Sequence, residues 1–224
     1  MYAFRKPSDQ RISRCLAAQQ QLAFSYVVRG ATRNEDSSPG YTIDHNRIYL
    51  GSGRDVYEAA KQALQSWRHF QLGWVHKHQP DRPPIVGDTV GVLAQAMGLW
   101  VLNVCRVVYV TEEQQPLRRY AFAYGTLPRH VESGEERFQV EWHEDDSVWY
   151  DIYAFSRPNQ LITKLAYPYA RRKQRQFAKN SMQAMRIAVN EQLCTNILNG
   201  MQSNSASEPR VAVQYPAMHS SMRG

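Results

Sequence analysis

Apolar and polar residues alternate through much of the middle of the chain. Between residues 88 and 157, five alternating or aromatic-rich runs predict strands, namely "DTVGVLAQAM", "LWVLNVCRVVYVTE", "LRRYAFAYGTL", "EERFQVEWH" and "SVWYDIYAFSR". Two earlier runs, "AFSYVVRG" and "YTIDHNRIYLGSG", predict two further strands. The connections within the five-strand block are short and polar, which favours antiparallel pairing.

Two other parts of the chain have the spacing of helices. Apolar residues recur every three or four positions from Val56 to Phe70, and a longer helical pattern runs from Gln160 to about Leu198. Few helices lie between strands, so a parallel sheet is excluded. The sequence therefore predicts an α+β fold, with a curved antiparallel sheet of about six or seven strands wrapped around the long C-terminal helix. We expect an extension at 1–22, one domain at 23–198 and a disordered tail at 199–224.

Composition narrows the class of protein. Apolar residues make up 43% of the 224 positions, which is enough for a large core, and no apolar run approaches the length of a membrane span. The N-terminus lacks the apolar centre of a secretory signal, although an organelle transit peptide remains an alternative. Three scattered cysteines, Cys15, Cys105 and Cys194, predict neither a zinc site nor a redox pair. We expect a cytoplasmic protein.

The net charge of +7 is concentrated in the C-terminal helix. On a helical projection its basic residues form one stripe, namely Lys164, Arg171, Arg172, Arg175, Lys179 and Arg186. This stripe is either a solvated face or an attachment surface for an anionic membrane through Arg171, Arg175 and Lys179. Nucleic acid is a poorer fit, because no groove-reading residues accompany the stripe. Lys173 falls on the opposite, apolar side and needs a partner or a ligand there, unless Pro168 kinks the helix and turns Lys173 to solvent.

The stretch "YGTLPRHVESGEERFQVEW" carries the strongest candidate chemistry. Alternation along its strand places Glu136, Phe138, Val140 and Trp142 on one face, which we take as the inner one, and Glu135 and Arg137 on the other. His130 lies in the preceding loop. His130 and Glu136 are interpreted as a general acid and base, as groups that orient a ligand, or as stabilisers of the hairpin.

Other candidate groups are weaker. Asp151 is an acid in an apolar strand and needs a partner, for which Arg106 on a neighbouring strand is the candidate. The pair either contacts a ligand or is a structural ion pair at the edge of the sheet. His76 and His78 have the spacing of two zinc ligands on a strand, but no third ligand is near. We therefore expect no metal and no cofactor.

Several stretches together resemble a family of bacterial and plant proteins known as a domain of unknown function. They are "DHNRIYLGSG", "GLWVLNVCRVVYV", "AFAYGTLPRHVESGEERF", "EWHEDDSVWYDIYAFSRP" and "YPYARRKQRQFAKNSMQAM", and the resemblance runs from about Ala23 to Val189. The order of elements is also similar to the START-like, helix-grip superfamily of hydrophobic-ligand carriers and polyketide cyclases. That architecture implies a cavity between the sheet and the long helix.

The candidate residues, the basic stripe and this resemblance together lead to three hypotheses. The first is a protein that binds an apolar small molecule or lipid, with a pocket formed by Tyr124, Arg106, Phe138, Trp142, Asp151, Lys173 and Phe177, and by His130 and Glu136. The second is a cofactor-independent cyclase, dehydratase or isomerase that uses His130 and Glu136. The third is a peripheral membrane or scaffold protein that uses the basic face of the helix.

Overall fold

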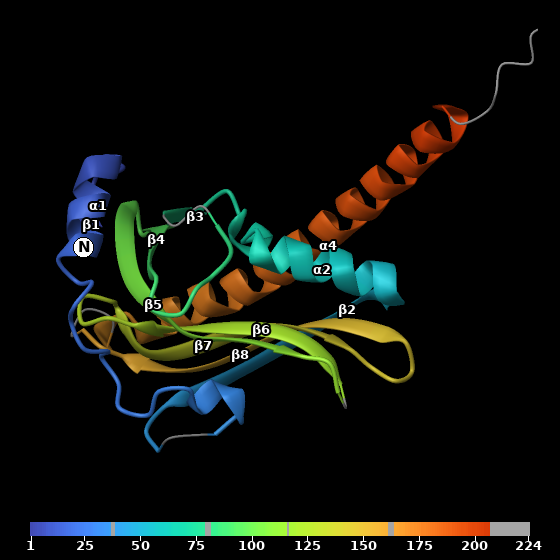
Figure 1. Cartoon of the computed structure of the whole chain (residues 1–224). Helices are drawn as coiled ribbons and strands as arrows, with labels where there is room; N and C mark the ends of the chain where they lie inside the picture. The colour runs from blue at the N-terminus through green and yellow to red at the C-terminus, as the bar shows by residue number, and fades with distance from the viewer. Residues whose placement is uncertain (37–38, 79–81, 116, 161–163, 207–224) are drawn as a thin grey trace, which may run out of the picture.

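A curved sheet with one long helix across its inner face forms the body of the protein (Figure 1). The structure is a computed structural model that describes residues 1–36, 39–78, 82–115, 117–160 and 164–206. The strands are β1 (Tyr2–Ala3), β2 (Thr42–Ser52), β3 (Val75–His78), β4 (Thr89–Ala96), β5 (Leu99–Glu113), β6 (Arg118–Thr126), β7 (Glu132–Trp142) and β8 (Ser147–Pro158). The helices are α1 (Asp9–Ala17), α2 (Arg54–Gln65) and α4 (Tyr167–Ala206), with short 3-10 helices η1 (Ala31–Arg33) and η2 (Arg68–Phe70).

The strands form one antiparallel sheet in the order β2-β8-β7-β6-β5-β4-β3, with β1 added beside β5. The predicted α+β class and the block of five consecutive strands are confirmed, and "YTIDHNRIYLGSG" forms β2 as expected. Two short strands were not predicted, β1 and β3, and β3 contains His76 and His78. The sheet therefore has eight strands instead of six or seven.

The main core lies between the sheet and the pair α2 and α4. Phe122, Phe138 and Tyr150 come from three neighbouring strands, and all three side chains are fully buried. Tyr150 also shares a hydrogen bond of 2.9 Å with the hydroxyl of Ser181, which ties α4 to the sheet. Trp67 follows the end of α2 by two residues, and its left-handed φ of 56° turns the chain so that η2 brings His69 into this aromatic cluster. Aromatic side chains fill the space between the sheet and the helices in this region.

Helix α4 begins later and ends later than predicted. It starts at Tyr167, so Pro168 stands in its first turn, where a missing backbone N–H costs nothing and no kink follows. The predicted phase shift that would turn Lys173 to solvent does not occur. The helix then continues to Ala206, beyond the sheet (Figure 1), so residues 199–206 are helical and the predicted tail was wrong there. The rest of that tail, 207–224, lies outside the described residues.

The first 36 residues are packed against the sheet. β1 pairs with β5, and Ile12 and Leu16 of α1 are buried against Leu93 and Leu102 of β4 and β5. The run "AFSYVVRG" is not a strand, which corrects the prediction. Instead, residues 23–36, called the outer-face segment from here on, lie across the outer face of β6, β7 and β8, where Tyr26 packs on Phe155.

Candidate functional site

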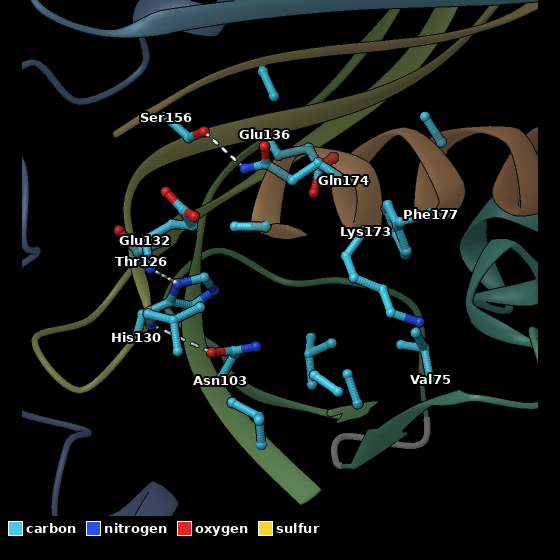
Figure 2. A pocket seen from close by; sticks show the side chains of 18 of the residues that line it. Val75, Asn103, Thr126, His130, Glu132, Glu136, Ser156, Lys173, Gln174 and Phe177 are labelled. Carbon is cyan, nitrogen blue, oxygen red and sulfur yellow. Dashed lines mark hydrogen bonds between the residues drawn. The ribbon is translucent and has the colours of Figure 1, made fainter. Parts of the chain in front are cut away.

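A cavity of about 310 Å³ lies between the inner face of the sheet and the first half of α4. Its wall is largely apolar and comes from β3 to β8 and from α4, including Val75, Val92, Val101, Ile152, Ala170 and Phe177. Two small residues on α4, Ala170 and Ala178, and Ala166 just before the helix leave room between the helix face and the sheet. Figure 2 shows the polar side chains that gather at one end of this cavity.

Glu136 reaches the cavity because of the alternation along β7. The same alternation places Glu132 and Gly134 on this face, so two carboxyl groups from one strand line one cavity. The hydroxyl of Tyr124, on the neighbouring strand, donates to Oε2 of Glu136 at 2.6 Å. Burial raises the pKa of Glu136 to about 7, although the bond from Tyr124 opposes that rise. The predicted inner position of Glu136 and the neighbouring Tyr124 are thus both found at the cavity.

Glu132 is a cavity residue that sequence reasoning missed. Burial raises the pKa of Glu132 to about 7, and the nearby Arg171 guanidinium partly opposes this rise. Within the described ranges no hydrogen bond to its carboxyl group is found, whereas its backbone N–H donates to Nδ1 of His130. The sequence could have indicated this position, because Glu132 stands four residues before Glu136 and alternation places both on the same face of the strand.

His130 lies in the turn between β6 and β7 and lines the same cavity. Its Nδ1 accepts a hydrogen bond of 2.9 Å from the backbone N–H of Glu132, so the neutral ring carries its proton on Nε2. Burial lowers the pKa of His130 to about 3, which keeps the ring neutral at physiological pH. No hydrogen bond between His130 and Glu136 is present in the described part of the chain, so the two line one cavity without forming a bonded pair.

Lys173 and Phe177 face the cavity from α4, as the helical projection predicted. The ammonium group of Lys173 lies 4.4 Å from the centre of the Trp74 ring and donates to the side chain of Gln176. Figure 2 shows Lys173 on the helix side, with its amine directed away from Glu132 and Glu136. The lysine is therefore stabilised by an aromatic ring rather than by an acid.

The other predicted pocket residues lie elsewhere. Phe138 is fully buried in the aromatic core, where it packs on His69 and Tyr124. Trp142 lies further along β7, where its Nε1 donates to Asp146 at 2.8 Å and its ring faces Tyr57. Because β7 is long, residues on one face of it reach both the cavity and the solid core, and Phe138 and Trp142 belong to the core.

The predicted pairing of Arg106 with Asp151 was wrong. Arg106 on β5 donates instead to the backbone carbonyls of Gln19 and Gln20. β6 and β7 separate β5 from β8, which carries Asp151, so the two side chains cannot meet across adjacent strands. Asp151 points to the outer face, where it accepts from Arg137 on β7 at 2.8 Å. Neither residue contacts the cavity.

Glu135 and Arg137 point away from the cavity, as predicted, but the outer-face segment buries them. The carboxylate of Glu135 accepts from the hydroxyls of Tyr26 and Thr32 and from the backbone N–H groups of Gly30 and Thr32. Opposite Glu135 stands Gly125, where any side chain would collide with Tyr26. Residues of the "GEERF" run therefore contact two different parts of the protein. Glu136 lines the cavity, and Glu135 and Arg137 bind the outer-face segment.

One group of side chains in the described ranges has the composition of a metal site. The oxygen and nitrogen ligand atoms of Glu35, His45 and Asp151 lie within 4.8 Å of one another on the outer face. Arg137 is 2.8 Å from both carboxylates, and His45 is 2.6 Å from Asp151. The guanidinium already neutralises these acids, so we interpret the group as an ion-pair network rather than a metal centre.

The basic stripe of α4 is smaller than predicted. Arg171 donates two hydrogen bonds to the carboxylate of Asp44 on β2, so Arg171 is committed to a contact within the fold. Arg175 and Lys179 lie further along α4, and their contact with a membrane stays a prediction. Within the described residues, α1, α2 and α4 all lack an apolar stretch of membrane-spanning length.

Comparison with known proteins places the chain among relatives of similar length. A family model described as Domain of unknown function (DUF1990) matches residues 25–184. A UPF0548 protein of Dictyostelium discoideum is 35% identical over 207 residues, covering 84% of this chain and 96% of that protein. A UPF0548 protein of Arabidopsis thaliana is 35% identical over 160 residues, covering 70% and 78%.

Similarity to solved structures is weaker. The crystal structure of TTHA0849 from Thermus thermophilus has a TM-score of 0.46 and 11% sequence identity, covering 67% of this chain and 98% of that chain. The crystal structure of ginseng major latex-like protein 151 from Panax ginseng has a TM-score of 0.39 and 13% identity, covering 66% and 96%.

Proposed function

The chain belongs to the DUF1990 (UPF0548) family, and on the evidence of its cavity we propose that it binds an apolar small molecule between the sheet and α4. The proposal rests on this chain's own side chains, because the family carries no assigned function. Tyr124, Lys173 and Phe177 contribute to the wall, and His130, Glu132 and Glu136 form the polar end.

The cavity itself is the observation that carries the proposal. Its volume of about 310 Å³ is at the lower end of the range of small-molecule sites. It has room for roughly ten waters, at about 30 Å³ each, which suits a ring compound or a single acyl chain better than a two-chain lipid. A mostly apolar wall with a few convergent polar groups is the usual composition of such sites. The neighbouring core between α2 and the sheet is filled, so the opening is local to the first half of α4.

Native mass spectrometry of gently purified protein, followed by organic extraction, tests the proposal. We expect an apolar compound bound in one-to-one ratio. The variant Ala170→Phe places a ring in the cavity and should abolish binding, whereas Ala184→Phe, further along α4 and outside the cavity wall, should retain it. A wild-type protein that takes up no apolar compound, even when such compounds are supplied, would disprove the proposal.

A second candidate is an enzyme that moves protons on such a ligand. The favouring observation is the pair of buried carboxyl groups, because burial raises the pKa of both Glu132 and Glu136 to about 7, near the value that serves proton transfer at neutral pH. In D2O, an enzyme of this kind would introduce deuterium into the bound compound, and Glu136→Gln would stop the exchange while binding persists. Absence of deuterium incorporation by the wild type would leave a binding protein.

A further inference from the structure

The polar end of the cavity presents hydrogen-bond donors that no part of the described chain accepts. His130 is the first of these. Because its Nδ1 accepts from the backbone of Glu132, its proton is on Nε2, and the Nε2 edge of the ring is directed into the cavity (Figure 2). The backbone of His130 is held as well, since its N–H donates to Leu127 and its carbonyl accepts from Asn159. The donor therefore has a fixed direction.

Asn103 on β5 supplies a second donor to the same cavity. Its Oδ1 accepts a hydrogen bond of 3.4 Å from the backbone N–H of Val131, which orients the side-chain amide. The NH2 group is thereby left on the cavity side, and within the described ranges it has no partner (Figure 2). Both side chains accept from consecutive backbone N–H groups, Asn103 from Val131 and His130 from Glu132. The backbone at these two residues therefore fixes the positions of the two donors relative to each other.

The two carboxyl groups complete the arrangement. Tyr124 donates to one oxygen of Glu136, which lines the cavity, and the other oxygen has no hydrogen-bond partner among the described residues. Glu132 offers a carboxyl group with no hydrogen-bond partner among the described residues. Burial raises the pKa of both groups to about 7, so their protonated forms, which also act as donors, are populated near neutral pH. An unpaired donor facing an apolar ligand is unfavourable, so a ligand that offers an acceptor here would be selected.

We propose that this end of the cavity recognises a neutral carbonyl group, as in a ketone, ester or lactone, on an otherwise apolar ligand. The inference rests on the proposed binding function and gives it a ligand class. A carbonyl oxygen has two lone pairs, which match the N–H groups of His130 and Asn103. A carboxylate ligand would meet Glu132 and Glu136, and repulsion would oppose it whenever either is ionised. An alkylammonium ion could pair with Glu132 or Glu136 when either is ionised, but it has no acceptor and would leave the N–H groups of His130 and Asn103 unpaired.

Titration of a matched set of eight-carbon compounds tests this inference. The probes are 2-octanone, octanoate, octylammonium and the hydrocarbon octane, with binding followed by the fluorescence of Trp74, which lines the cavity. We expect 2-octanone to bind tightest at pH 7. Asn103→Leu should weaken 2-octanone by about tenfold, the usual effect of one lost hydrogen bond, and leave octane unchanged. Asn103→Asp replaces the donor by an acceptor and should also shift the preference towards octylammonium.

A second substitution guards against a folding defect at position 103. His130→Gln retains an acceptor for the backbone of Glu132 and an N–H donor, so it should keep the preference for 2-octanone, whereas His130→Phe should lose it. If octane and octanoate bind but 2-octanone is not preferred, or if Asn103→Leu weakens all probes equally, the carbonyl inference is overturned and the binding function stands. If none of the four probes binds, both the inference and the proposed function fail.

Discussion

Replacing His69 by phenylalanine is expected to stabilise the protein, and to stabilise it more in acid than at neutral pH. His69 is fully buried, and its ring lies among Phe70, Phe122 and Phe138. Neither ring nitrogen has a hydrogen-bond partner in the described part of the chain. A benzene ring has a similar flat shape and no polar atoms, so His69→Phe removes two unsatisfied groups from an aromatic core.

The magnitude has a part that is independent of pH and a part that depends on it. Each unsatisfied buried polar atom destabilises the folded protein by about 1–3 kcal/mol. The larger ring of phenylalanine overpacks the core, and this destabilises the variant by about 1–2 kcal/mol. A net gain of about 2 kcal/mol at pH 7.5 follows. The size of this pH-independent gain depends on how well the neighbouring side chains adjust to the larger ring. Met185 and Leu64 belong to the same core and are fully buried, so little free space surrounds that ring.

The pH-dependent part follows from the titration of His69. Burial lowers the pKa of His69 from 6.5 to about 3. Between these values the unfolded chain binds a proton that the folded protein does not, so acid favours unfolding. At pH 5 this costs the wild type about 2 kcal/mol, and at pH 7.5 almost nothing. The advantage of His69→Phe should therefore be about 2 kcal/mol larger at pH 5, whatever the packing cost.

Urea denaturation followed by tryptophan fluorescence at pH 7.5, 6.5 and 5 measures the free energy of unfolding of both proteins. The difference between them removes the contributions of all other titrating groups, including His130, Glu132 and Glu136. His69→Leu serves as a control, because it has the same pH-dependent effect with a side chain of different shape. A difference that stays constant from pH 7.5 to pH 5 would refute the reasoning, since it would mean that His69 is not buried in its neutral form.

Three other substitutions test the outer face, the cavity and the contact of α4 with β2. Gly125→Ala should destabilise the protein by about 2–4 kcal/mol, because the added Cβ would collide with the hydroxyl oxygen of Tyr26. Glu136→Gln should raise stability at pH 8 by up to about 3 kcal/mol and not at pH 4.5, because the folded pKa of about 7 makes ionisation above that pH costly. Arg171→Ala should lower stability by about 1–3 kcal/mol, because it leaves Asp44 without its bidentate partner. Urea midpoints measure all three.

Controls for these variants come from exposed positions. Glu144→Gln and Arg172→Ala change charge at exposed sites and should shift stability by less than about 0.5 kcal/mol. An unchanged midpoint for Gly125→Ala would mean that Tyr26 does not lie against the sheet. A gain for Glu136→Gln that is equal at pH 4.5 and pH 8 would contradict a buried carboxyl group. Equal effects of Arg171→Ala and Arg172→Ala would place Arg171 on the solvated face after all.

The sequence predicted well those features that depend on residues close together in the chain. Alternation along β7 placed Glu136 inside and Arg137 outside, because side chains point to opposite faces of any strand whatever its neighbours are. The helical projection placed Lys173 and Phe177 towards the sheet for the same local reason. The same alternation would have predicted that Glu132 faces the cavity, if the predicted strand had begun a few residues earlier.

The features that were missed depend on the order of strands and on distant segments. The partner of Asp151 could not be chosen without knowing that β7, and not β5, lies beside β8. The division of one strand face into cavity and core, which separates Glu136 from Phe138, depends on where α2 and η2 pack. Burial of Glu135 by residues 26–32 joins positions more than 100 apart, for which the local pattern gives no sign.

The outer-face segment has a consequence for the order of events during synthesis. Tyr26 and Thr32 leave the ribosome early, but their partner Glu135 follows 109 and 103 residues later. At about 5–20 residues per second, the segment waits roughly 5–20 s before β7 exists for it to cover. In that interval the exposed Val27 and Val28, together with Tyr26, are free to meet chaperones or other nascent chains. Closure of the outer face must therefore be a late step, and variants that loosen it should reduce the yield of folded protein before they alter the finished cavity.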